Sequence, residues 1–216
     1  MAAGSTATTW VMKMTTKQEK LWAGKFGNEY HGRNVQKNRN EFWYEVLAGR
    51  FSELTSVLEL GAGQGDNLVA IGNYMMGKRV LVGLDINEQA CAQMRERGIV
   101  PINSPFIGAQ LHGRYDLVLT RGFLIHQPLE VLEETLRGIY DLSSRYICIA
   151  EYYATKRRGL LYRGHFQALW ADDFAGRMME LYPDLKLLKY GFKYHTDDGD
   201  DITYFLLEKP VDESLR

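Results

Sequence analysis

A glycine-rich turn with an acidic residue close before it is the strongest chemical signal in the sequence. A buried strand that contains Glu59 runs into Gly61-Ala62-Gly63-Gln64-Gly65 and then into a helix that includes Asn67. Glycines permit a tight turn and let a ligand approach the backbone closely. Glu59 is costly to bury unless a cation or a hydrogen-bond donor meets its carboxylate. A sulfonium ligand with an ammonium group is such a partner, whereas a pyrophosphate is not.

A second acidic residue, Asp85, ends the next strand, 24 residues after Gly61. An acid at this place reaches the two hydroxyls of a ribose. The loop spacing is Gly-x-Gly-x-Gly, which differs from the Gly-x-Gly-x-x-Gly of dinucleotide sites. We therefore expect S-adenosylmethionine rather than NAD, with Glu59 near its methionine end and Asp85 and Ile86 at its ribose. The alternative interpretation is that Glu59 caps a loop and Asp85 caps the following helix.

These residues need strands that end at one edge of a sheet, and the middle of the chain predicts them. Four apolar runs alternate with helical patterns, which is typical of βαβ units in a parallel sheet. We expect strands at 56–60, 79–84, 115–120 and 146–150, and helices at 66–76, 87–97, 128–141 and 171–181. Two further β-rich stretches, 186–194 and 201–209, are joined by a polar turn and predict an antiparallel hairpin that closes the sheet.

Composition narrows the class of protein. The chain has 216 residues, of which 45% are hydrophobic and 25% charged, and this fits one compact domain rather than a disordered or fibrous chain. The formal charge of -1 lacks the excess of Lys and Arg that nonspecific nucleic-acid binding needs. Cys91 and Cys148 predict neither a disulfide framework nor a zinc site, so we expect a reducing compartment, the cytoplasm. No apolar run reaches the ~20 residues of a membrane span, and no signal peptide is recognisable.

Polar residues that follow the strands at 115–120 and 146–150 should face a second substrate, because ligands of open α/β sheets lie beyond the carboxyl ends of the strands. His126 suits a general base near neutral pH, and Glu151 suits proton removal or the binding of a polar group. Tyr152 and Tyr153 follow directly, Tyr152 as a binding candidate and Tyr153 as a third catalytic one. The alternatives are that His126 is a structural hydrogen-bond partner and that the tyrosines belong to the core.

A further group of candidates lies later in the chain. Tyr162-Arg163-Gly164-His165 places two cations around a glycine, which suits a clamp for a carboxylate or phosphate, and His195 in the closing hairpin can join it. The alternative is a solvated basic loop that continues Lys156-Arg157-Arg158. No cluster of Asp and Asn residues indicates a metal site, so we expect no metal. The substrate expected from this clamp is a small, polar, anionic metabolite.

The glycine loop, Asp85 and the order of strands and helices resemble the class I S-adenosylmethionine methyltransferases. This resemblance implies a Rossmann-like, mostly parallel seven-stranded sheet with a C-terminal antiparallel hairpin and an N-terminal helical lid. It implies that Asn103 and Ser104 pack against the adenine and that Thr120 lies beside the methionine moiety. The alternative interpretation of Asn103 is a turn residue. The lid would carry Tyr30 and Arg33, with Arg33 meeting the carboxylate of the cofactor.

Other segments carry a narrower resemblance: Leu21 to Tyr30 with Arg33-Asn34, Val57 to Leu68, Thr120 to His126, Glu151 to Tyr153, Tyr162 to His165, Asp173 to Gly176, Tyr190 to Phe192 with His195, and Asp200 to Lys209. They resemble the methylases associated with pseudaminic acid biosynthesis, over nearly all of the chain from Thr15 to Lys209. Two departures are the first 14 residues, which are extra, and the basic stretch 155–161, where a proline-containing one is expected. The family name records a pathway and leaves the methyl acceptor open.

The sequence therefore predicts a methyltransferase that moves a methyl group from S-adenosylmethionine to oxygen or nitrogen of a small molecule. We expect a flexible leader over 1–14, the lid over 15–50, the methyltransferase domain over 51–209 and a tail over 210–216. We also expect a monomer or homodimer with a small-molecule acceptor, and neither a membrane nor a nucleic acid as partner. Two alternatives are a non-catalytic subunit that binds S-adenosylmethionine and a nucleic-acid or protein methyltransferase. Thr120-Arg121-Gly122-Phe123 lacks the Asn/Asp-Pro-Pro-aromatic run of amino-methylating nucleic-acid enzymes.

Overall fold

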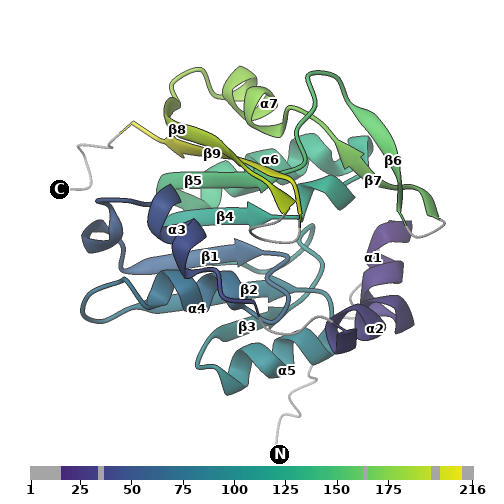
Figure 1. Ribbon diagram of the computed structural model, residues 1–216, viewed down its shortest axis with the longest axis horizontal. Helices are drawn as coiled ribbons and strands as arrows, with labels where there is room; N and C mark the ends of the chain where they lie inside the picture. The colour runs from purple at the N-terminus through teal and green to yellow at the C-terminus, as the bar shows by residue number, and fades with distance from the viewer. Residues whose placement is uncertain (1–15, 34–36, 163–164, 196–199, 211–216) are drawn as a thin grey trace, which may run out of the picture.

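A seven-stranded sheet forms the centre of the molecule (Figure 1). The computed structural model describes residues 16–33, 37–162, 165–195 and 200–210, without the side chains of 31–33, 162 and 165–168. The strand order is β3-β2-β1-β4-β5-β9-β8; the first five strands are parallel, and β9 and β8 form the predicted antiparallel hairpin. The strands are β1 Ser56–Leu60, β2 Val80–Asp85, β3 Val100–Asn103, β4 Tyr115–Arg121, β5 Ser143–Glu151, β8 Lys186–Lys193 and β9 Ile202–Glu208.

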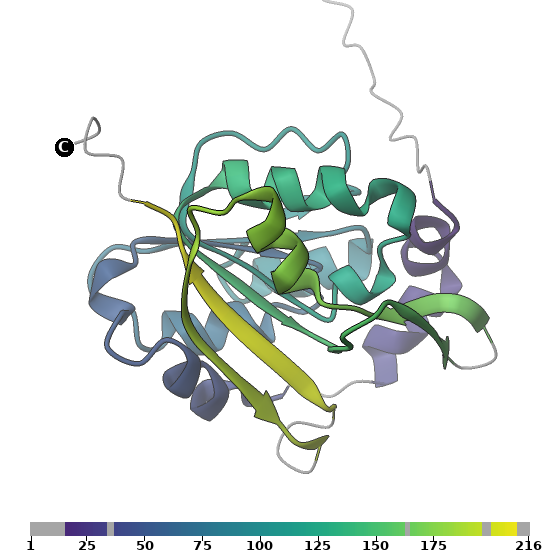
Figure 2. The same ribbon diagram turned by 90° about the horizontal axis from the view of Figure 1, so that it is seen from above.

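Helices cover both faces of the sheet (Figure 2). Successive side chains of the central strands point to opposite faces, so Val57 and Leu119 face one layer while Leu58 and Val118 face the other. The first layer holds α3 Asn40–Val46, α4 Asp66–Gly72 and α5 Glu88–Glu96, and the second holds α6 Leu129–Leu142 and α7 Phe174–Leu181. The predicted α/β architecture is confirmed. Among the described residues, no helix is long and apolar enough to cross a membrane.

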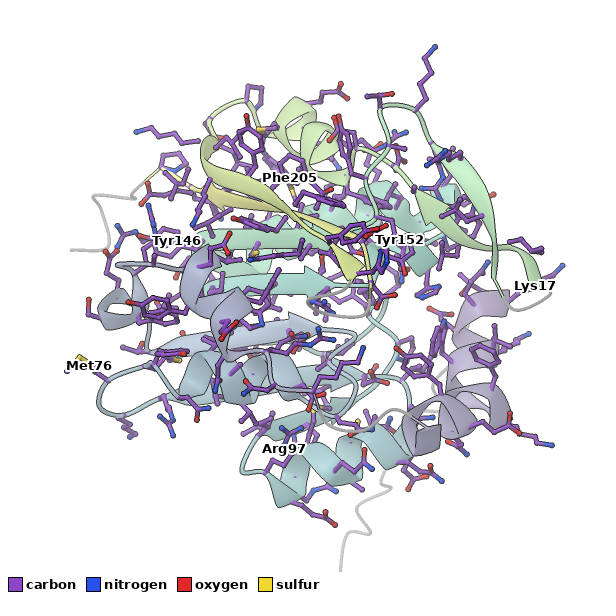
Figure 3. All side chains as sticks on the ribbon, viewed as in Figure 1. Lys17, Met76, Arg97, Tyr146, Tyr152 and Phe205 are labelled. Atoms are coloured by element: carbon purple, nitrogen blue, oxygen red, sulfur yellow. The ribbon has the colours of Figure 1, made fainter. Side chains whose placement is uncertain are left out.

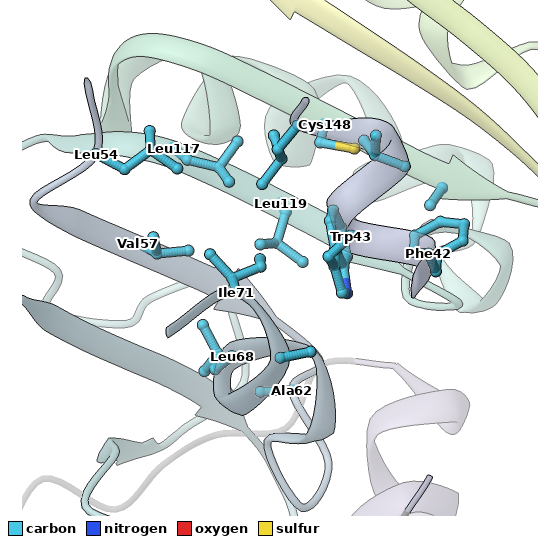
Figure 4. Close-up of a cluster of buried hydrophobic side chains, with 14 of the residues drawn as sticks. Phe42, Trp43, Leu54, Val57, Ala62, Leu68, Ile71, Leu117, Leu119 and Cys148 are labelled. Atoms are coloured by element: carbon cyan, nitrogen blue, oxygen red, sulfur yellow. The ribbon is translucent and has the colours of Figure 1, made fainter. Parts of the chain in front are cut away.

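Helix α3 belongs to the core, although the sequence analysis placed its residues in a lid over 15–50. Phe42 and Trp43 pack beside Leu68, Leu119 and Cys148 (Figure 4). Trp43 is completely buried. Burial of an aromatic side chain of this size contributes several kcal/mol in the ~20–33 cal/mol per Å² range of the hydrophobic effect. The aromatic run of α3 therefore reports packing against the sheet rather than closure over a ligand.

Three shorter elements lie at the carboxyl ends of the parallel strands. The helical pair α1 Lys17–Ala23 and α2 Lys25–Arg33 stands beside a two-stranded antiparallel sheet, β6 Arg158–Tyr162 and β7 His165–Ala171 (Figure 1). The third element is the 3-10 turn η2 Leu124–His126, which follows β4. Strands β6 and β7 were not predicted from the sequence, because neither segment shows a regular alternation of apolar and polar residues. Arg157 ties this hairpin to η2 by donating to the Gln127 carbonyl over 2.7 Å.

Candidate active site

A cavity of about 460 Å³ opens at the carboxyl ends of the parallel strands. The glycine loop and the ends of β2 and β4 line it, together with residues of α1, α2 and β7. Figure 3 shows Tyr152 at this end of the sheet, whereas Tyr146 and Met76 lie toward the opposite end. The cavity brings together many of the predicted site residues: Tyr30, Gly61, Ala62, Gly63, Asn67, Asp85, Ile86, Ser104, His126 and Tyr152.

The glycine loop turns tightly at the wall of the cavity. Gly61 and Gly63 have φ angles of 68° and 53°, in the left-handed region that favours glycine. The N–H groups of Gly61 and Ala62 donate to the Leu84 carbonyl over 2.8 and 3.0 Å, which ties the loop to β2. A Cβ atom at Gly61 would lie 2.8 Å from the Phe123 ring. Gly61 therefore permits both the turn and the close packing of the segment that follows β4.

Backbone donors fix the Asp85 carboxylate in the cavity wall. The Gly63 N–H donates to Oδ2 over 2.8 Å, and the Asn87 N–H donates to Oδ1 over 2.8 Å. Both contacts set the direction in which the carboxylate points. A carboxylate offers about four acceptor sites, and this arrangement suits two neighbouring hydroxyls such as those of a ribose.

Glu59 is completely buried next to the glycine loop and does not itself line the cavity. Asn67 stands between them: its Nδ2 donates to Glu59 Oε1 over 2.6 Å, and its Oδ1 accepts from Trp43 Nε1 over 2.9 Å. Glu59 Oε2 has no hydrogen-bond partner among the described residues. Burial raises the pKa of Glu59 to about 8, against the lowering effects of Asn67 and Arg121. A buried carboxylate with an unsatisfied oxygen suits a cationic group bound beyond Asn67.

Three cationic residues, Lys37, Arg39 and Arg121, line the same cavity as Asn67. Burial, and next the charge of Arg121, lower the pKa of Arg39 to about 10. Burial also lowers the pKa of Arg121, while the negative charge of Asp200 raises it. Guanidinium groups that repel one another in a partly enclosed site are suited to an anion, and their planar fork fits a carboxylate.

Glu151, predicted as a catalytic residue, holds the backbone of η2 rather than facing the cavity. Its carboxylate accepts hydrogen bonds from the N–H groups of Phe123, Leu124 and Ile125 over 3.1, 3.0 and 3.3 Å. The side chain is buried, and burial raises its pKa to about 7 although these backbone donors lower it. These contacts place His126, the last residue of η2, at the cavity.

His126 and Trp22 face each other at the cavity. Their ring centroids are 4.8 Å apart in an edge-on arrangement. Trp22 also packs edge-on against Tyr30, with 5.2 Å between ring centroids. The indole Nε1 of Trp22 is buried and has no hydrogen-bond partner among the described residues. With Gln127 and Leu169, these rings form a wall that combines an imidazole with apolar surface.

Some predicted site residues lie outside the cavity. Tyr153 is 41% exposed and packs near Phe205, with 5.9 Å between ring centroids. It points away because successive side chains after β5 face opposite sides of the sheet, and Tyr152 takes the cavity side. His195 is exposed, and its ring Nδ1 lies 3.0 Å from Asp201 Oδ1.

The remaining predicted residues fall into two groups. Thr120 is buried at the end of β4, and Asn103 is exposed and donates to the Asp85 carbonyl over 3.1 Å. Neither lines the cavity, whereas Ser104 does. The others have side chains outside the described residues: Arg33, Tyr162, Arg163 and His165.

Arg39, Lys37 and Trp22 line the cavity but were not predicted from the sequence. Arg39 precedes an aromatic helix and Lys37 lies in a polar connection, and neither belongs to a motif. Trp22 lies in one of the segments that carry the narrower resemblance, which was a usable signal. Arg121 directly follows Thr120 in a segment that was expected to face the substrate.

Comparisons with known proteins agree on the fold. No protein-family model matches the chain, and no curated protein matches its sequence at a significant level. Magnesium protoporphyrin IX methyltransferase from Synechocystis PCC 6803, solved with S-adenosylhomocysteine, is 14% identical with a TM-score of 0.66, covering 89% of this chain and 97% of that one. The 1,6-didemethyltoxoflavin-N1-methyltransferase from Burkholderia thailandensis, solved with 1,6-didemethyltoxoflavin and S-adenosylhomocysteine, is 16% identical with a TM-score of 0.66, covering 91% and 92%.

A third solved structure extends the comparison. The N-methyltransferase NodS from Bradyrhizobium japonicum WM9 is 11% identical with a TM-score of 0.60, covering 82% of this chain and 99% of that one. These identities are low, and the similarity therefore concerns the arrangement of the elements. The chain has the Rossmann-like fold of the class I methyltransferases.

Proposed function

We propose that the protein transfers the methyl group of S-adenosylmethionine to oxygen or nitrogen of a small polar molecule. The observation that carries this proposal is the Asp85 carboxylate, which backbone donors fix beside the glycine loop in the same cavity as His126. Such a carboxylate suits the ribose of the cofactor. The methyltransferases of similar fold that were solved with S-adenosylhomocysteine support the choice of cofactor.

The residues at the other end of the cofactor site fit the amino-acid moiety. Arg39 suits its carboxylate, and Glu59 behind Asn67 suits its ammonium group. A zwitterion at this place would put its carboxylate beside the neighbouring cations and its ammonium group on the side of Asn67 that faces the cavity, within electrostatic reach of Glu59. When bound, S-adenosylmethionine supplies an electrophilic methyl group on its sulfonium. We call this part of the cavity, lined by Arg39, Gly61 to Gln64, Asp66, Asn67 and Asp85, the cofactor half.

The part of the cavity lined by Trp22, Phe123, Ile125 to Gln127 and Leu169 is called the acceptor half. We assign proton removal from the acceptor to His126, and Glu151 holds the turn that carries it. Methyl transfer then needs in-line approach of the acceptor atom at ~3 to 3.5 Å. The porphyrin and toxoflavin enzymes act on small molecules, in support of an acceptor of that class here.

Two finer parts of the proposal rest on the sequence. The pseudaminic acid-associated resemblance supports a sugar or sugar-acid acceptor, and its segments supply Trp22, Tyr30 and His126 to the cavity. The anionic character of the acceptor rests on Arg163, which lies outside the described residues.

Calorimetry with S-adenosylhomocysteine tests the cofactor assignment. Asp85→Ala should weaken its binding by about 1 to 3 kcal/mol, because ribose hydroxyls lose their hydrogen-bond acceptor. Asp184→Ala, which changes an exposed carboxylate that accepts from Tyr140, is the matched control and should bind normally. Unchanged affinity of a folded Asp85→Ala protein, or tighter binding of NAD than of S-adenosylhomocysteine, would remove the assignment. Binding without transfer of labelled methyl groups to any small-molecule extract would favour the non-catalytic alternative.

A further inference from the structure

Asn87 is completely buried, and all three of its N–H donors make hydrogen bonds. Its backbone N–H donates to Asp85 Oδ1 over 2.8 Å, and its side-chain Oδ1 accepts from the Ala90 N–H over 3.1 Å to cap α5. Its Nδ2 donates to the Trp22 carbonyl over 3.2 Å and to Asn28 Oδ1 over 2.8 Å. One residue thus contacts the ribose-facing carboxylate, the start of α5 and both helices of the α1 and α2 pair.

The two Nδ2 contacts exceed what a helix cap requires. A cap needs only the side-chain oxygen, which Ser or Asp supplies equally well. The side-chain nitrogen instead reaches residues 59 and 65 positions earlier in the chain. Those contacts connect the start of α5 to both α1 and α2, so they help to set where the pair sits.

The packing around Gly27 shows how closely the pair meets Asn87. A Cβ atom at Gly27 would lie 1.9 Å from the Trp22 carbonyl oxygen and 2.9 Å from Asn87 Nδ2. Glycine is therefore required for α2 to approach both groups. The same segment carries the Trp22 ring to 4.8 Å from the His126 ring.

We propose that Asn87 is a positioning residue that couples the ribose site at Asp85 to the placement of Trp22 against His126. This inference rests on the proposed function for its second step only. A ligand that binds to Asp85 restricts the motion of the turn from Asp85 to Asn87. Because the side chain of Asn87 is hydrogen-bonded to α1 and α2, the motion of these two helices is restricted as well. Cofactor binding would then complete the acceptor half before transfer.

Hydrogen exchange measured by mass spectrometry on the full chain tests the anchor without any ligand. Asn87→Ser keeps a capping oxygen but loses both Nδ2 donors, so peptides covering 17–30 should exchange about tenfold faster while those covering 88–96 do not change. Asn28→Ala removes one partner from the other side and should give a smaller increase of about threefold. Asp173→Ser is the matched control, because it retains the cap of α7 without touching the pair. Unchanged exchange of 17–30 in both Asn87→Ser and Asn28→Ala would reduce Asn87 to a simple helix cap and overturn the proposal.

The same measurement with saturating S-adenosylhomocysteine tests the coupling. In the natural protein the ligand should slow exchange over 17–30 by tenfold or more, and Asn87→Ser should lose most of this protection even when calorimetry shows its site filled. Full ligand protection of 17–30 in Asn87→Ser would mean that the ligand orders the helices directly, and the coupling would be refuted. A natural protein that fails to bind S-adenosylhomocysteine would refute the proposed function and the coupling together, whereas the ligand-free comparison would still decide whether Asn87 anchors the helices.

Discussion

The cofactor half and the acceptor half each depend on a buried glutamate at the end of a parallel strand, and the two carboxylates are treated in opposite ways. Within the part of the chain that the structure describes, Glu59 receives one side-chain hydrogen bond and keeps an oxygen without a partner, and burial raises its pKa to about 8. Glu151 receives three backbone hydrogen bonds, and burial raises its pKa to about 7. A carboxylate satisfied within the protein supports the backbone, whereas one left unsatisfied is suited to a ligand.

The difference follows from what surrounds each strand end. After β1 the chain turns back at once through glycines, so its N–H groups bond to β2 and to Asp85 instead of Glu59. After β4 the chain forms the irregular turn η2, whose N–H groups need an acceptor that the turn itself does not provide. Glu151 from the neighbouring strand β5 supplies it.

The largest effect expected from this comparison is loss of stability in Glu151→Ala. Three buried N–H groups would lose their acceptor, and at about 1 to 3 kcal/mol for each unsatisfied group the free energy of unfolding should fall by at least about 3 kcal/mol. Urea denaturation measures this change. Glu151→Gln keeps one carbonyl oxygen as acceptor and should lose less than half as much.

The same variants separate structure from chemistry. If Glu151 takes the proton during methyl transfer, Glu151→Gln should abolish turnover while the protein keeps most of its stability. We assign proton removal to His126, so Glu151→Gln should lower turnover only as far as it disturbs the position of η2, and His126→Gln should lower it more. A stable Glu151→Gln protein without any turnover would instead mean that Glu151, not His126, removes the proton.

Glu59→Gln removes a titrating group, and this should change both the stability of the protein and its binding of the cofactor. The pKa of Glu59 is raised in the folded chain, so its contribution to stability is complete below the unfolded value near pH 4.5 and is lost as the pH rises through about 8. Replacing it with an uncharged amide should stabilise the ligand-free protein by about 1 to 3 kcal/mol near pH 8. Thermal unfolding at pH 5 and pH 8 measures this difference, which should be small at pH 5.

Binding should change in the opposite direction. Ionised Glu59 attracts the ammonium group of S-adenosylhomocysteine, so affinity should rise about fivefold from pH 6 to about pH 8 and then level off, with a proton released on binding. Glu59→Gln should bind more weakly at pH 8 and show a flat profile. Calorimetry in two buffers of different ionisation enthalpy measures whether a proton is released on binding. An unchanged pH profile in Glu59→Gln would assign the titration to another group.

The cofactor half was largely predictable from the sequence, because local patterns specify it. Glycines after an apolar strand and an acid at the end of the next strand are brought together by the sheet itself, as Gly63 and Asp85 are. The acceptor half depends on contacts between distant segments, such as Trp22 with His126, and no local pattern encodes them. Arg39 was missed for the same reason: only the packing of α3 in the core brings it beside Arg121.

Alternation after a strand explains the one neighbouring pair that the sequence could not resolve, Tyr152 and Tyr153. Both follow β5, yet only Tyr152 reaches the cavity, where its hydroxyl donates to Asp200 Oδ1 over 2.9 Å. Tyr153 faces the other side of the sheet near Phe205 and is 41% exposed. A contribution to the site is therefore expected from Tyr152 alone. Its hydroxyl holds Asp200, whose negative charge acts on Arg121.

The smallest expected effects compare these two tyrosines. Tyr153→Ala should change the free energy of unfolding by no more than about 0.5 kcal/mol, because exposed substitutions away from special features have little effect. Its affinity for S-adenosylhomocysteine should not change. Tyr152→Phe removes only the hydroxyl that holds Asp200, so its affinity should fall about two- to threefold, within the range of one hydrogen bond. Calorimetry on both variants at one pH measures the contrast, and a larger loss in Tyr153→Ala than in Tyr152→Phe would mean that the side of the sheet near Phe205, not the cavity, contributes to the site.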